Sequence, residues 1–168
     1  EGDYVVRVQD TLGVNPECQR WCDLDEFDKA FAKVTRNQDP SELGAGLQQC
    51  SSLYAGPCLD GCFQDWALEK REHYERLALE VFTRRAEWEL SSGQHLAALE
   101  QAQEALKLDQ CSQKAALLAM KAHQGLGQSE EAVRLFTNLQ RRLSRELGME
   151  PSIELMEAYH RARLGLTS

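Results

Sequence analysis

The cysteines are the residues of this sequence whose spacing could support chemistry. Two pairs, Cys18/Cys22 and Cys58/Cys62, each place their members four residues apart. Zinc commonly takes cysteine ligands from pairs with two to four intervening residues, so four thiolates from these pairs could hold one zinc ion. The alternative is that the cysteines are free thiols that act as small hydrophobic side chains in a reducing cytosol. We favour the free-thiol interpretation, because the tighter C-x-x-C spacing is absent.

Motifs that would indicate an enzyme are missing from the sequence. It contains no G-x-x-x-x-G-K-[ST], G-x-G-x-x-G, H-E-x-x-H or G-x-S-x-G segment. Its four histidines stand far apart along the chain, and an isolated histidine is more often a surface or half-buried ring than a catalytic base. We therefore expect neither catalysis nor a cofactor.

The charge of the chain is negative and unevenly distributed. The formal net charge is −8, of which residues 1–66 carry −7 (5 Lys/Arg, 12 Asp/Glu) and residues 67–168 carry −1 (14 and 15). Gripping a nucleic-acid backbone needs clustered positive charge, so we expect this chain to reach DNA only through another domain. No run of about 18 apolar residues is present to span a membrane, and we expect a cytoplasmic protein.

Two glycines, Gly93 and Gly127, lie 34 residues apart between helical patterns, and each is followed five residues later by an alanine, Ala98 or Ala132. A period of 34 residues with a helix, a glycine turn and a second helix is typical of tetratricopeptide repeats. Glycine allows the tight turn, and alanine lets the second helix approach closely. The sequence therefore predicts an interaction scaffold.

Periodicity and capping signals predict an all-α, tetratricopeptide-like, right-handed stack of about seven antiparallel helices. The first helix is expected to begin at residue 23, and the longest to cover residues 64–91. A short N-terminal strand is expected at residues 4–8, followed by a loop through Gly13.

The long helix carries two apolar stripes, which predicts neighbours on both sides. One stripe is Tyr74, Leu77, Val81 and Trp88, and the other is Leu79, Phe82, Ala86 and Leu90. Trp66 and Trp88 are expected to anchor the core or the repeat interface. Ile153, Met156 and Tyr159 are expected to form the apolar face of the last helix.

Two segments resemble a known family. Residues 54–61 (YAGPCLDG) with residues 65–69 (DWALE), and residues 143–155 (LSRELGMEPSIEL), are similar to the opening and closing signatures of the bacterial transcriptional activator domain of Streptomyces-type antibiotic regulators. The resemblance covers nearly the whole chain. In that family Cys58 and Cys62 would stand at large apolar positions, which favours a core role for this pair.

The resemblance implies a domain organisation. Residues 23–168 would form the activator domain, and residues 1–22 would be a linker that retains a remnant of the wing strand of an upstream winged-helix domain. That upstream domain would bind DNA.

Two functional hypotheses follow. In the first, the chain is the effector and oligomerisation domain of a transcription regulator, which contacts a second copy, RNA polymerase or another regulator. The basic cluster Arg141, Arg142 and Arg145 is then a candidate protein contact, although a solvated helix face with cations in its last turn is the more common explanation of such a cluster. In the second, the chain is a stand-alone tetratricopeptide-like adaptor that binds a peptide or small ligand in a concave groove.

We expect protein purified without chelator to carry no stoichiometric zinc, because the thiols serve as packing groups. Metal analysis by mass spectrometry checks this. One zinc per chain, lost in Cys18→Ser or Cys22→Ser but kept in the control Cys111→Ser, would show that the thiolates bind metal.

Overall fold

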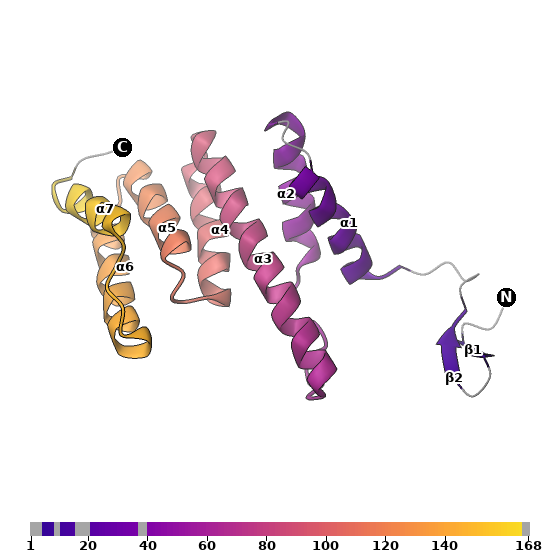
Figure 1. Ribbon diagram of the computed structural model, residues 1–168. Helices are drawn as coiled ribbons and strands as arrows, with labels where there is room; N and C mark the ends of the chain where they lie inside the picture. The colour runs from indigo at the N-terminus through magenta and orange to yellow at the C-terminus, as the bar shows by residue number, and fades with distance from the viewer. Residues whose placement is uncertain (1–4, 9–10, 16–20, 37–39, 166–168) are drawn as a thin grey trace.

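The computed structural model describes residues 5–8, 11–15, 21–36 and 40–165, and the described part is almost entirely helical (Figure 1). The helices are α1 Asp23–Arg36, α2 Pro40–Leu53, α3 Asp65–Ser91, α4 His95–Leu108, α5 Gln113–Gly125, α6 Ser129–Arg142, the short π-helix η1 Leu143–Leu147, and α7 Ile153–Arg163. Successive helices pack against one another in chain order.

Two short strands precede the helices. The strands β1 Val5–Val8 and β2 Thr11–Val14 pair in an antiparallel register that sets Val6 opposite Gly13. The loop predicted through Gly13 is therefore wrong, because Gly13 lies inside the second strand. β-Branched residues at both ends of β2 favour the extended conformation and outweigh the glycine between them.

The longest helix, α3, is buried along two faces and lies between the α1–α2 pair and helices α4 to α7 (Figure 1). On one face Tyr74 and Val81 pack with α1 and α2, and on the other Ala78 and Phe82 pack with α4 and α5. Both predicted stripes are confirmed. The residues that receive the first face are Phe27, Ala30, Val34, Leu47 and Cys50.

The contact between α2 and α3 depends on a glycine, because that residue has no side chain to separate the two helices. Gly44 lies against the indole ring of Trp88 so closely that an added Cβ would overlap the ring, and Trp88 is thereby half-buried beside the core, as predicted. A polar link lies alongside it: the guanidinium of Arg85 donates to the hydroxyl of Ser51 and pairs with the buried carboxylate of Glu89 at 3.6 Å.

The turns at the two repeat glycines have the same geometry. Gly93 and Gly127 have φ of 73° and 72°, in the left-handed region that glycine adopts at low cost. In each turn the glycine N–H and the following glutamine N–H donate back to the preceding helix, the pattern of a Schellman cap. These bonds are Gly93 to Leu90 (3.0 Å), Gln94 to Glu89 (2.8 Å), Gly127 to Gln124 (3.0 Å) and Gln128 to His123 (2.8 Å).

The predicted burial of Trp66, and of Ile153 and Met156, is wrong, because no described helix packs over these side chains. Trp66 is 58% exposed and is no core anchor, because the first turn of α3 projects beyond α4 (Figure 1). Ile153 is 68% exposed and Met156 is also exposed. The last helix instead packs through Leu155, with Tyr159 stacked on Phe136 at 4.3 Å between ring centroids. No helix of the described chain covers the side of α7 on which Ile153 and Met156 are exposed.

We expect Ala98→Leu to lower the free energy of unfolding by about 1–3 kcal/mol, because Ala98 has no exposed surface and a larger side chain overpacks the contact between α3, α4 and α5. Chemical denaturation measures this. The control Gln103→Leu adds the same side chain to an exposed site on the same helix and should change stability by less than about 0.5 kcal/mol. Equal effects of the two variants would contradict a tight contact at Ala98.

Candidate functional site

The proposed zinc cysteines do not assemble into a metal site among the described residues. Cys18 lies outside those residues; Cys22 directly precedes α1, and Cys58 and Cys62 lie in the connection between α2 and α3. The described parts of the chain contain no group of three or more His, Cys, Asp or Glu side chains placed to hold a metal ion. The described cysteines are all free.

Two of the described thiols are packed into the core on the α1–α2 side. Burial raises the pKa of Cys50, which has no exposed surface, to about 11. Burial also raises the pKa of Cys58, while the nearby guanidinium of Arg71 opposes the shift. A thiol becomes a good nucleophile or metal ligand when its pKa is lowered, so Cys50 and Cys58 have the properties of packing groups.

The connection between α2 and α3 is held by a single arginine. The guanidinium of Arg71 donates from Nε to the carbonyl of Cys58 (3.2 Å) and from Nη2 to the carbonyls of Leu59 (2.7 Å) and Cys62 (3.3 Å). Leu59 has φ of 54°, a costly conformation for a residue with a branched side chain, which persists only where its surroundings enforce it. The three bonds from Arg71 supply that enforcement.

The same segment exposes large apolar side chains. Phe63 is 79% exposed, and Leu59 and Trp66 are also exposed. Aromatic side chains left in solvent on an ordered segment are characteristic of contact surfaces. Sequence reasoning missed this feature, although the turn residues Gly56-Pro57 and Asp60-Gly61 signalled a tight, irregular connection.

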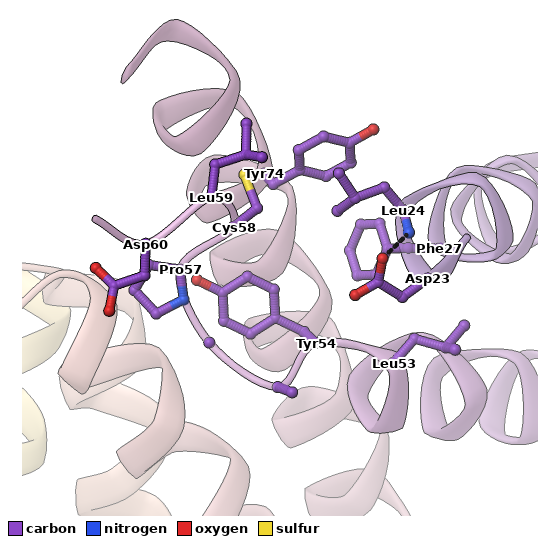
Figure 2. A pocket seen from close by; sticks show the side chains of 12 residues that line it. Asp23, Leu24, Phe27, Leu53, Tyr54, Pro57, Cys58, Leu59, Asp60 and Tyr74 are labelled. Carbon is purple, nitrogen blue, oxygen red and sulfur yellow. Dashed lines mark hydrogen bonds between the residues drawn. The ribbon is translucent and has the colours of Figure 1, made fainter. Parts of the chain in front are cut away.

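A cavity of about 450 Å³ opens between α1, the α2–α3 connection and α3 (Figure 2). Among the described residues, the charged side chains that line it are Asp23 and Asp60, both acidic. The hydroxyl of Tyr74 donates to Asp28 at 3.0 Å, whereas the hydroxyl of Tyr54 is buried and has no hydrogen-bond partner among the described residues. The lining residues are Asp23, Leu24, Phe27, Leu53, Tyr54, Ala55, Gly56, Pro57, Cys58, Leu59, Asp60 and Tyr74.

The predicted arginine cluster lies at the end of α6 and in η1. Arg142 and Arg145 both reach Glu146, at 3.7 and 2.8 Å. The hydrogen bond from Arg145 contributes most to lowering the pKa of Glu146. Glu146 also accepts a 3.6 Å contact from the thiol of Cys111, in the α4–α5 connection. Two of the three arginines thus share one carboxylate, which leaves a net positive charge, and exposed Arg141 has no ion pair within the described chain.

The last helix, α7, exposes apolar side chains on a face that it shares with the exposed Glu157 and His160. Ile153, Met156 and Leu164 are exposed, and their spacing of three and eight residues places them on one side of α7. Leu147 and Met149, which precede α7, are exposed as well. We call the side chains of Ile153, Met156 and Leu164 the outer face of α7.

We expect Arg71→Met to loosen the α2–α3 connection, because it keeps the aliphatic stem but removes three hydrogen bonds to carbonyls. Amide hydrogen exchange in residues 54–64 should accelerate, while exchange in α4 and α5 stays unchanged. The global loss of stability should be about 1–3 kcal/mol. The control Lys70→Met changes an exposed neighbour and should leave exchange as in the wild type; unchanged exchange in Arg71→Met would show that the connection does not need its arginine.

Comparison with known proteins agrees with this architecture. No curated protein matches the sequence. The fold is similar to the C-terminal TPR-containing domain of a Plasmodium falciparum protein described as an FK506-binding protein, with a TM-score of 0.59, 13% identity, and coverage of 84% of this chain and 86% of that chain. This likeness establishes a tetratricopeptide-like fold. No helix of the described residues is both long and apolar enough to cross a membrane. The family model described as the bacterial transcriptional activator domain matches residues 22–163, so this chain belongs to that family.

Proposed function

We propose that this domain is the effector and oligomerisation part of a bacterial transcription regulator, and that it acts through protein–protein contacts. Family membership supports the regulatory role. The observation that supports a protein contact is the exposure of apolar side chains on the outer face of α7. The partner would be a second copy of the chain, RNA polymerase or another regulator in the cytoplasm.

Three exposed apolar side chains lie on one side of α7, where no helix of the described residues covers them. Here Ile153 is largely exposed and Met156 and Leu164 lie on the same side. Burying apolar surface stabilises association by about 25 cal/mol per Å². A complex in which a partner covers these side chains would therefore be stabilised in proportion to the apolar area that it buries.

The arginine cluster fits the rim of such a contact. Arg142 and Arg145 lie beside Glu146, at 3.7 and 2.8 Å. Exposed Arg141 on the last turn of α6 is available to an acidic group on a partner. Charged groups at the rim of an interface mainly set specificity and association rate.

DNA binding is assigned to an upstream winged-helix domain. The acidic residues of the N-terminal third oppose phosphate binding by this chain. The β1–β2 hairpin is consistent with the wing that ends such a domain, and residues 1–22 would then join the wing to the activator domain at residue 23. The domain itself would carry no catalytic activity.

We expect residues 1–168 to dimerise in a concentration-dependent manner, and Ile153→Glu to weaken dimerisation at least tenfold by placing a charge in the contact. Analytical ultracentrifugation measures both. Leu96→Glu is the matched control, since Leu96 is also exposed (62%) but lies on α4. A monomer at every concentration refutes the oligomerisation role. Saturable, sequence-specific DNA binding by this fragment in a gel shift would refute the assignment of DNA binding to an upstream domain.

A further inference from the structure

We propose that the cavity between α1, the α2–α3 connection and α3 binds a small organic cation, in which an ammonium group is attached to an aromatic or alkyl body. This inference is independent of the role of α7. It rests on the size of the cavity, its aromatic walls, the sign of its charges and one buried hydroxyl that lacks a partner.

The size and walls of the cavity suit a small organic molecule. Its volume of about 450 Å³ lies within the usual range of roughly 300–1,000 Å³ for ligand sites. Phe27 contributes a ring whose centroid is 6.5 Å from that of Tyr54 and 6.0 Å from that of Tyr74, and Figure 2 shows the three rings around the hollow. Aromatic faces attract cations through their negative quadrupole.

The charges contributed to the lining by the described residues are both negative. Asp23 uses Oδ1 to accept from the N–H of Leu24 at 2.9 Å, and its Oδ2 has no hydrogen-bond partner in the described chain. Figure 2 shows this carboxylate on the side of the hollow opposite Tyr54. Asp60, at the other rim, accepts from the N–H of Gly61 at 2.9 Å. An ammonium group near Asp23 would gain a charge-assisted hydrogen bond.

The surrounding charges agree with this preference. Burial contributes most to raising the pKa of Tyr54, and the carboxylate of Glu75 adds to the shift. Glu75 and Asp23 act in the same direction on the pKa of Cys58. Arg71, which acts on Cys58 in the opposite direction, is directed to backbone carbonyls of the connection and is not among the described lining residues. The charges of the described lining therefore favour a cation over an anion.

The hydroxyl of Tyr54 is an unused hydrogen-bonding group at the wall. It is buried and has no hydrogen-bond partner within the described part of the chain, and such groups in native proteins call for an explanation. A ligand that enters beside Pro57 and displaces the connection slightly would reach this oxygen. A metal ion does not fit, because the described residues bring no three donor side chains together.

Three probes of similar shape test the charge preference: phenethylamine (cationic), 2-phenylethanol (neutral) and 3-phenylpropionate (anionic). Titrations followed by NMR give both affinity and location. We expect phenethylamine to bind at least tenfold more tightly than 2-phenylethanol and to shift the ring resonances of Phe27, Tyr54 and Tyr74. We expect no saturable binding of 3-phenylpropionate.

Variants test the residues. Asp23→Asn keeps an acceptor for the N–H of Leu24 and should weaken phenethylamine binding about tenfold, whereas Asp25→Asn, on exposed α1 surface outside the cavity, should not change it. Tyr54→Phe removes the unpartnered hydroxyl, and should weaken binding at least twofold without lowering the thermal midpoint of unfolding. Equal affinity for the amine and the alcohol, equal effects of the two aspartate variants, or no binding at 10 mM amine would overturn the proposal.

Discussion

The structure depends on one helix that must be buried on two sides. α3 is 27 residues long, and it supplies Tyr74 and Val81 to the cluster with α1 and α2 while Ala78, Phe82 and Ala86 face α4 and α5. Small residues are what make this geometry feasible. Alanines on the α4–α5 side allow helices to approach closely, and Gly44 of α2 admits the Trp88 ring on the opposite side.

The two sides of α3 satisfy their backbone polar groups in different ways. On the α4–α7 side, the turns at Gly93 and Gly127 bond back to the preceding helix through backbone N–H groups alone, so no side chain is needed to hold them. On the α1–α2 side, the connection before α3 needs Arg71 to bond three carbonyls and holds Leu59 in a strained conformation. Strain and incomplete hydrogen bonding tend to gather at sites where a protein does something other than fold, and the cavity with the unpartnered hydroxyl of Tyr54 lies at this connection.

Within the described residues, α7 is packed against other helices on one side. Leu155, Ala158 and Ala162 on one side of α7 complete the core, which leaves Ile153 and Met156 facing outward. A monomeric protein could place polar residues there without loss to its own packing. Exposed apolar residues at this position are compatible with the protein contact proposed for this domain.

The sequence by itself determined the features that are local. The 3.6-residue periodicity located the helices, and the two stripes of α3 identified it as an inner helix. The 34-residue spacing of Gly93 and Gly127 indicated the repeat. Each of these features can be found from the order of residues along the chain alone.

The tertiary structure decided which apolar side chains are covered and which polar groups converge. Trp66 and Ile153 are exposed because no helix of the described residues covers them, and periodicity along the chain carries no information about this. The cavity joins residues near positions 23–27, 53–60 and 74, and the bonds of Arg71 reach 9 to 13 residues back along the chain. Such contacts arise only when helices dock, since docking alone sets the distances between residues that are remote in sequence.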